Sequence, residues 1–141
     1  MEAHPLRTWQ ATLYQKLRHA PDKREIIFVV DKKGDQGKSW FGRYYCDTHD
    51  DGQVLIPGKK ADMAYVVNED KRVFFMDCPR SKQGDFIQYD FLEEIKNGYI
   101  FSGKYESMCK RLKTPHVVIL MNELPDMSKL SADRYNIITL T

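Results

Sequence analysis

The sequence lacks any apolar run of about eighteen residues, the length that a membrane-spanning helix requires. It also lacks the apolar core of a signal peptide near its start. Cysteine is scarce: Cys46, Cys78 and Cys109 are odd in number and do not have the spacing of metal ligands. We therefore expect no membrane partner, and free thiols in a reducing compartment.

An excess of charge and a histidine cluster are absent as well. The net charge of +2 provides no general attraction for nucleic acid, so any such contact must be local. The four histidines are scattered without zinc spacing, and no Ser-His-Asp or Cys-His arrangement is evident. With 141 residues, of which 42% are hydrophobic, the chain is expected to form one domain with a substantial core.

What the sequence does contain is an apolar run at residues 26–30, followed by a glycine-bearing loop and by Gly37-Lys38-Ser39. A buried strand, a glycine loop and a helix opening on Gly-Lys-Ser are typical of a phosphate-binding loop. Glycines let backbone N–H groups curl around phosphates, and the helix contributes its positive end. Lys38 would pair with the β- and γ-phosphates, and Ser39 would hold Mg²⁺ through its hydroxyl. The predicted nucleotide-binding residues are Gly34, Asp35, Gln36, Gly37, Lys38, Ser39 and Trp40.

One position departs from this pattern. The full G-x-x-x-x-G-K-[ST] motif requires glycine at position 32, which is Lys32 here, and Gly34 comes two residues later. A surface hairpin turn rich in Gly and Lys is the alternative explanation. The strand before the loop and the helix after it favour the phosphate-binding interpretation.

The remaining patterns predict an α/β protein with a mainly parallel sheet. Unbroken apolar runs are typical of strands buried on both faces of such a sheet. The expected helices span residues 5–19, 38–46 and 86–95, the expected strands 25–31, 61–67, 72–77, 116–121 and 134–140, and a hairpin 99–105.

Polar residues follow two of these strands at the edge where ligands of parallel sheets bind. Asp77 ends the strand 72–77, where a carboxylate can hold the Mg²⁺ shell and order an attacking water. Asn122 follows the strand 116–121 and is placed to orient water or contact the γ-phosphate. Asp77 as a cap for the next turn, and Asn122 as an ordinary turn residue, are the alternatives.

Two further cationic features have competing explanations. Arg134 has the chemistry of an arginine finger, although its spacing alone favours a salt bridge, for example to Asp133. Lys96, Lys104 and Tyr105 flank the expected hairpin, where lysine and aromatic side chains can bind single-stranded nucleic acid; a solvated hairpin fits equally well. The basic run at residues 110–113 is interpreted as a charged helix end.

Taken together, these segments resemble the helicase domain of the replication-initiator (Rep) proteins of circular single-stranded DNA viruses of the nanovirus- and circovirus-like group, within the superfamily 3 helicases and AAA+ ATPases. The resemblance covers most of the chain. It rests on Leu6-Arg7-Thr8-Trp9-Gln10, Gly34-Asp35-Gln36-Gly37-Lys38-Ser39, Phe75-Met76-Asp77-Cys78-Pro79-Arg80, Ile95-Lys96-Asn97-Gly98, Phe101-Ser102-Gly103-Lys104-Tyr105-Glu106-Ser107, Pro115-His116-Val117-Val118-Ile119-Leu120-Met121-Asn122, Pro125-Asp126 and Leu130-Ser131-Ala132-Asp133-Arg134-Tyr135.

The resemblance implies a P-loop NTPase (AAA+-like) three-layer fold with a central, mainly parallel sheet flanked by helices. It implies ATP and Mg²⁺ as cofactors, and a hexameric ring that translocates on single-stranded DNA in the host nucleus. By position it assigns Walker A to residues 37–39 and Walker B to Asp77. It makes Asn122 the motif C sensor and Arg134 the arginine finger that reaches a neighbouring subunit. The segment from Lys96 to Lys104, which includes Asn97, corresponds to the DNA-facing hairpin, and Tyr105 follows it.

The sequence departs from the family in two ways. Walker B has the single acid Asp77, flanked by Met76 and Cys78, so the identity of the catalytic base is open. No His-hydrophobic-His pair occurs, so we expect no nicking activity. The chain is interpreted as a domain of a longer protein, with residues 1–22 ending an oligomerisation region and 23–141 forming the ATPase domain. Ring assembly of this fragment is expected to be weak and concentration-dependent.

Two other functions remain compatible with the sequence. A P-loop kinase for a small metabolite would need an arginine-rich lid and an acceptor pocket, which the sequence does not suggest. A nucleotide-binding regulatory module with little turnover would be consistent with the single Walker B acid. Stimulation of hydrolysis by single-stranded DNA would distinguish a helicase from both.

Overall fold

Five parallel strands form the central sheet in the order β2-β3-β6-β1-β7. The computed structural model describes residues 5–78, 87–103 and 108–140 of the chain. β1 and β6 are buried along their whole length, as their unbroken apolar sequences predict. The strands are β1 (Ile26–Asp31), β2 (Gly52–Leu55), β3 (Val73–Asp77), β6 (His116–Met121) and β7 (Tyr135–Leu140).

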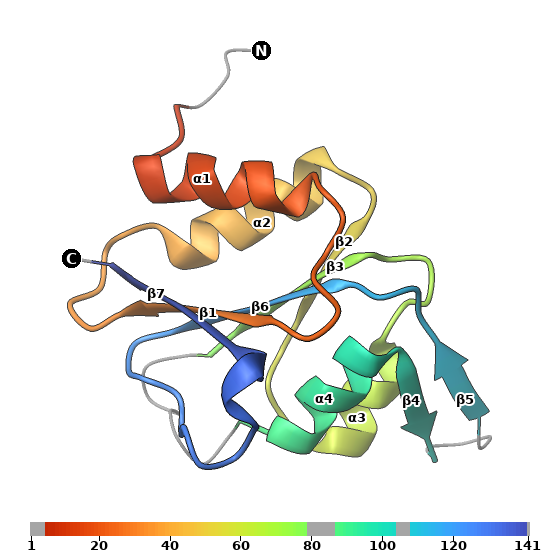
Figure 1. Ribbon diagram of the computed structural model, residues 1–141. Coiled ribbons are helices and arrows are strands. Elements are labelled where there is room, and N and C mark those ends of the chain that lie inside the picture. Colours follow the sequence, from red (N-terminus) through yellow and green to blue (C-terminus); the bar gives the residue numbers. More distant parts are fainter. Residues whose placement is uncertain (1–4, 79–86, 104–107, 141) are drawn as a thin grey trace.

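Helices cover both faces of the sheet and make a three-layer architecture (Figure 1). α1 (Thr8–Leu17) and α2 (Lys38–Thr48) lie on one face, whereas α3 (Lys60–Val66) and α4 (Tyr89–Asn97) lie on the other. Alternate residues of each strand point to opposite faces, so the sheet divides the apolar core in two. This arrangement confirms the expected α/β class with a mainly parallel central sheet flanked by helices.

A second, two-stranded antiparallel sheet pairs β4 (Tyr99–Ser102) with β5 (Met108–Arg111). The hairpin was expected over residues 99–105; its first strand lies there, but its second strand comes later, at residues 108–111. Lys110 fixes it to the body of the protein, because its Nζ donates to the carbonyl oxygens of Ala64 and Val67 at 2.9 Å each, and to that of Tyr65. These carbonyls lie at the end of α3, where a cation also complements the helix dipole.

Two expectations about secondary structure are wrong. Residues 61–67 were expected to form a strand, but most of them belong to α3, because Met63, Ala64 and Val67 share one buried helical face. The edge strand β2 instead begins at Gly52, where the sequence predicts only a turn. Lys110 and Arg111 lie in β5 rather than at a helix end.

A short 3₁₀ helix, η2 (Ala132–Arg134), leads into β7. Because β7 runs parallel to β1, Tyr135 pairs with Ile26 and Leu140 with Asp31. η2 therefore lies at the amino edge of the sheet, and the loop after β1 lies at the carboxyl edge. Among the helices that the structure describes, none is long and apolar enough to span a membrane.

Candidate functional site

The predicted phosphate-binding loop connects the end of β1 to the start of α2, at the carboxyl edge of the sheet. Its backbone enters the left-handed region at Gly34 (φ 91°), Asp35 (φ 64°) and Gly37 (φ 80°). Glycine adopts this conformation without steric cost, and aspartate is among the few other residues that tolerate it. Gly37 is the N-cap of α2, so Lys38 and Ser39 occupy its first turn, as expected.

Asp31 organises this loop from within. Its carboxylate accepts hydrogen bonds from the N–H groups of Gly34 at 2.9 Å, Lys33 at 3.2 Å and Gln36 at 3.3 Å. It also forms an ion pair with Lys38 at 3.6 Å. Asp31 is 1% exposed and Lys38 is also buried. Sequence reasoning treated Asp31 only as the end of a strand. The signal that marks it is an aspartate immediately before a glycine turn, where its side chain can bond the following backbone.

The surroundings of Asp31 favour its charged form. Burial by itself would raise the pKa of this carboxyl, but the N–H donors of the loop and the Lys38 ammonium outweigh burial and hold the pKa below its usual value. The anion thus stays paired with Lys38 inside the loop. A phosphate that binds here must compete with Asp31 for the Lys38 charge.

One pocket of about 360 Å³ brings together the predicted nucleotide-binding residues. Strands β1, β3 and β6 are adjacent in the sheet, so their carboxyl ends converge on it. Asp77, at the end of β3, pairs in register with Leu120 of β6. The lining residues are Gly34, Asp35, Gln36, Gly37, Lys38, Ser39, Trp40, Asp77, Cys78 and Asn122.

Asn122 has a defined position in this pocket. Its Nδ2 donates to the backbone carbonyl oxygen of Asp31 at 3.0 Å. The amide thereby joins the end of β6 to the start of the loop. A change at Asn122 would shift the loop as well as the polar lining of the pocket.

The pocket offers Mg²⁺ a small set of oxygen ligands, the Ser39 hydroxyl and the Asp77 carboxylate. Mg²⁺ usually takes one or two protein ligands and completes its shell with water and substrate phosphate, so this set fits the ion. Burial raises the pKa of the neighbouring Cys78 thiol to about 12 and so favours its neutral form. No group of three or more His, Cys, Asp and Glu side chains suited to a metal occurs among the described residues.

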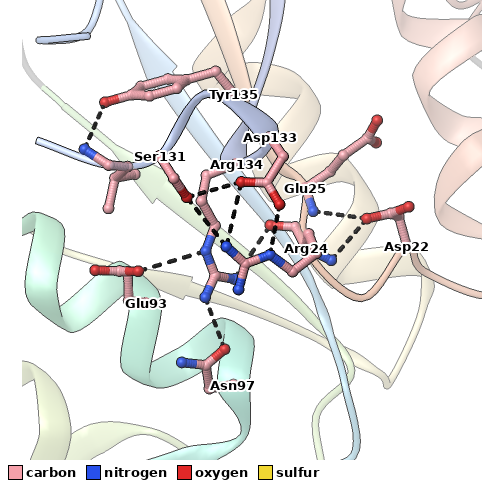
Figure 2. Close-up of polar contacts among 10 residues, drawn as sticks. Asp22, Arg24, Glu25, Glu93, Asn97, Ser131, Asp133, Arg134 and Tyr135 are labelled. Carbon is pink, nitrogen blue, oxygen red and sulfur yellow. Dashed lines mark hydrogen bonds and ion pairs between the residues drawn. The ribbon is translucent and has the colours of Figure 1, made fainter. Parts of the chain in front are cut away.

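Arg134 lies far from this pocket, in a buried network at the amino edge of the sheet (Figure 2). It is 1% exposed. Its Nη2 donates to Oδ1 of Asn97 at 2.9 Å, its Nη1 to the carbonyl oxygen of Arg24 at 3.3 Å, and its Nε lies 3.5 Å from Oε2 of Glu93. The six residues of β1 separate the two edges of the sheet by roughly 20 Å. In this structure the guanidinium is held by its own chain and does not project toward a neighbour.

The salt bridge suggested by spacing involves a different arginine. Asp133 pairs with Arg24, whose Nε lies 2.8 Å from Oδ2 of Asp133, and Ser131 also donates to Asp133 (Figure 2). The hydrogen bonds from Arg24 and Ser131 lower the pKa of Asp133 to about 2. This exposed pair lies beside the buried guanidinium of Arg134.

The residues predicted to bind DNA divide into two groups. Lys96 is 2% exposed and its Nζ donates to the carbonyl oxygen of Pro115 at 2.8 Å, while the side chain of Asn97 accepts from Arg134. Burial lowers the pKa of Lys96 to about 8. The Lys96 ammonium therefore points into the protein in this structure, whereas Asn97 is exposed and its side chain bonds Arg134. Lys104 and Tyr105 lie outside the described residues.

Sequence reasoning missed the outward face of the hairpin. Tyr99 and Phe101 are exposed, Phe101 to 75%, and Arg111 lies over the Tyr99 ring at 5.3 Å from its centroid. Tyr99 pairs with Arg111 across the two strands, so aromatic and basic side chains share one face. The signal was the alternation in Tyr99-Ile100-Phe101-Ser102, in which Ile100 and Ser102 are buried.

Comparison with known proteins identifies relatives of this chain. No protein-family model matches the chain. The chain is 39% identical over 137 residues to the Para-Rep C9 of Faba bean necrotic yellows C9 alphasatellite, which covers 96% of this chain and 48% of that protein. It is 32% identical over 124 residues to the master replication protein of Subterranean clover stunt virus (strain F), which covers 88% of this chain and 42% of that protein. The chain is a homologue of nanovirus and alphasatellite Rep proteins.

A third relative extends the same pattern. The Para-Rep C6 of Subterranean clover stunt C6 alphasatellite is 36% identical over 139 residues, which are 96% of this chain and 48% of that protein. The chain thus spans about half the length of the curated relatives it matches.

Proposed function

We propose that this chain is the ATP-hydrolysing DNA helicase domain of a viral Rep protein, which moves along single-stranded DNA as a ring during viral DNA replication in the host nucleus. The observation that carries the proposal is the single pocket in which the glycine loop, Lys38, Ser39, Asp77 and Asn122 meet. The names of the relatives, which are replication proteins, support a role in replication. The strand order, with β1 between β6 and β7, is compatible with a P-loop NTPase.

In this proposal Lys38 exchanges its partner Asp31 for the β- and γ-phosphates of ATP, because a multivalent phosphate attracts the ammonium more strongly than one carboxylate does. Bound Mg²⁺ would neutralise developing charge on the phosphates, and Ser39 and Asp77 would hold it. Asp77 orders the attacking water through its carboxylate. Asn122 anchors the loop to the end of β6 through its hydrogen bond to the carbonyl oxygen of Asp31, and it also lines the same pocket.

The role of Arg134 as an arginine finger is a separate proposal. It requires the guanidinium to leave Glu93, Asn97 and the carbonyl of Arg24, so that it can reach a neighbouring subunit. Mixing Arg134→Ala subunits with Lys38→Ala subunits tests this role, because a mixed interface with Lys38 from the first variant and Arg134 from the second is complete, whereas the reverse interface lacks both residues. Recovery of ATP hydrolysis in the mixture is the expected result. A mixture as inactive as its components, at ring-forming concentrations, would count against it.

Single-stranded DNA is proposed to bind at the hairpin β4–β5. Exposed Tyr99 and Phe101 can stack on bases while Arg111 attracts the phosphate backbone, a combination common to single-strand binding surfaces. Lys104 and Tyr105 remain predicted contacts at the same hairpin. Lys96 is buried in this structure and would contribute to DNA binding only if it became exposed, whereas Asn97 is exposed and remains a predicted contact.

The deciding experiment is steady-state ATP hydrolysis with and without single-stranded DNA. A helicase motor couples turnover to DNA, so the rate should rise when DNA is added. A DNA-independent rate would favour a metabolite kinase. Binding of ATP without turnover would favour a regulatory module, which the single acid Asp77 keeps in consideration.

A further inference from the structure

A cleft of about 550 Å³ adjoins the pocket that contains Lys38, on the side of the edge strand β2. Ser39 and Asp77 line both cavities, so the two meet at the residues that are proposed to hold Mg²⁺. A group placed in the cleft therefore approaches a bound nucleotide from the side of its terminal phosphate. Among the described residues that line the cleft, Arg43 is the one cation.

The helix α2 directs Arg43 toward the phosphate site. Arg43 follows Ser39 by four residues, so the two share one face of the helix and lie about 6 Å apart along its axis. Side chains of a helix lean toward its N-terminus, which here is the phosphate-binding loop. Arg43 is exposed, so its long side chain can turn into the cleft without first leaving the core.

Arg43 is also available for a ligand. In the part of the chain that the structure describes, neither its guanidinium nor the Asp77 carboxylate takes part in a hydrogen bond or an ion pair. Arg134, by contrast, is buried at the opposite edge of the sheet, where three groups of its own chain hold its guanidinium. Arg43 can therefore reach the terminal phosphate without giving up a partner, whereas Arg134 must break its network.

The floor of the cleft strengthens the effect of a charge. Phe75 and Leu120 line it, and both are buried and apolar. Charges interact more strongly beside such a surface than in bulk water, because less solvent screens them. A guanidinium adds planar pairs of N–H donors that match the oxygens of a phosphate.

These donors suit the charge that develops during ATP hydrolysis. The attacking water forms a bond to the γ-phosphorus while the bond to the bridging oxygen breaks, and the electron pair of that bond leaves with ADP. The proton of the water ends on the released phosphate. Arg43 would donate hydrogen bonds to the γ-phosphate oxygens throughout and would exchange no proton.

We propose that Arg43 is a further catalytic residue of the proposed ATPase, and that its guanidinium contacts the terminal phosphate from this cleft within the same subunit. The inference rests on the proposed phosphate site and adds to it a cation that Arg134 does not supply in this structure. The contact strengthens as charge develops in the transition state. Arg43 therefore contributes to turnover more than to nucleotide binding.

ATP hydrolysis and ADP binding, both measured with Mg²⁺ on Arg43→Ala, test this role. The kcat should fall by about 100-fold, as expected for the loss of one electrostatic contact in the transition state, while the affinity for ADP stays the same. Arg43→Lys keeps the charge without the paired donors and should recover only part of the rate. Arg72→Ala, which removes an exposed arginine at the amino edge of the sheet, is the matched control and should leave the rate unchanged.

Binding of ADP with aluminium fluoride, which mimics the transferring phosphoryl group, gives a readout that does not depend on turnover. Arg43→Ala should bind this complex about 100-fold more weakly than the unmodified chain does, and ADP alone equally well. Equal weakening of the two ligands would make Arg43 a binding residue and overturn its catalytic role.

Mixing variants tests whether Arg43 acts within its own subunit. Arg43→Ala and Lys38→Ala subunits together contain no complete site if both residues serve the same subunit, so the mixture should be no more active than its components. Recovery of hydrolysis in the mixture would overturn action within one subunit.

Lys38→Ala distinguishes failure of this inference from failure of the phosphate site. Unchanged ADP binding in Lys38→Ala would remove the phosphate site, and the role of Arg43 with it. Loss of ADP binding in Lys38→Ala, together with equal turnover in Arg43→Ala and Arg72→Ala, would overturn the role of Arg43 alone.

Discussion

At the scale of single residues, Lys38 carries the charge on which the proposed phosphate binding depends. Lys38→Ala should lower ATP turnover by about 100- to 1,000-fold, the usual effect of removing one electrostatic contact to the reacting group. The matched control is Lys32→Ala, which removes an exposed lysine from the same loop. Steady-state hydrolysis of both variants is the measurement. If both lose turnover equally, general loop charge rather than Lys38 supports the reaction.

Asp31 is the residue whose ionisation should be visible in stability. Its pKa is lower in the folded chain than in the unfolded chain, so the charged carboxylate stabilises the fold above the unfolded pKa, near 4. That contribution is lost as the pH falls through the lower, folded pKa. Asp31→Asn should cost roughly 3 kcal/mol of unfolding free energy at pH 7, because Lys38 loses its buried partner.

Urea unfolding of the wild type and Asp31→Asn at pH 7 and near pH 3 measures this effect. The difference in unfolding free energy between the two proteins should shrink at the acidic pH, where the wild-type carboxyl begins to protonate. A difference of the same size at both pH values would mean that the carboxylate charge does not organise the loop.

At the scale of elements, Arg134 connects η2 and β7 to α4 and to the segment before β1. Arg134→Ala should lower the unfolding free energy by roughly 3 kcal/mol, because its hydrogen bonds to Asn97 and to the carbonyl of Arg24 are lost and a large buried side chain is removed. Arg24→Ala is the matched control; it removes an exposed ion pair with Asp133 that water screens, so its effect should be much smaller. Chemical denaturation measures both. Equal effects of the two variants would refute the structural role of the buried guanidinium.

The hairpin is the element that should bind DNA. Phe101→Ala should weaken single-stranded DNA binding by about tenfold, since stacking on one base contributes 1 to 3 kcal/mol by alanine substitution. Folding should be unaffected, because the ring is 75% exposed. Fluorescence anisotropy with a labelled oligonucleotide measures the affinity. Met127→Ala, which changes another exposed apolar residue, is the control. Equal affinities of the two variants would argue against DNA binding by the hairpin.

At the scale of the whole molecule, the loop between β1 and α2 and the hairpin of β4 and β5 lie at opposite ends of the fold (Figure 1). The loop follows β1 at the carboxyl edge of the sheet. The hairpin ends at Arg111, shortly before β6 begins at residue 116, and therefore lies near the amino edge. If neighbouring subunits complete each site, hydrolysis per subunit should rise with protein concentration. Turnover measured over a dilution series, alongside sedimentation, tests this expectation. A rate per subunit that stays constant while the oligomer dissociates would argue against a shared site.

The sequence by itself determined the features that depend on local pattern. Unbroken apolar runs determined β1, β3 and β6, and glycines determined the loop before Lys38. Asp77 and Asn122 follow the ends of two strands, and they lie at one edge because parallel strands align their carboxyl ends. The α1 helix and the first strand of the hairpin were also predicted from local pattern, whereas the second strand of the hairpin was not.

Only the tertiary structure decided which cations face solvent. Lys96 was expected beside a DNA-facing hairpin, Lys110 at a charged helix end, and Arg134 in an arginine finger or a salt bridge. Each is buried and bonded to groups distant in sequence. Long cationic side chains have apolar stems that pack inside while the charged end finds carbonyls or carboxylates, and those partners come from other elements. The same dependence on neighbours made residues 61–67 mostly helical and Gly52 the start of an edge strand, because burial against the assembled sheet decides such short segments.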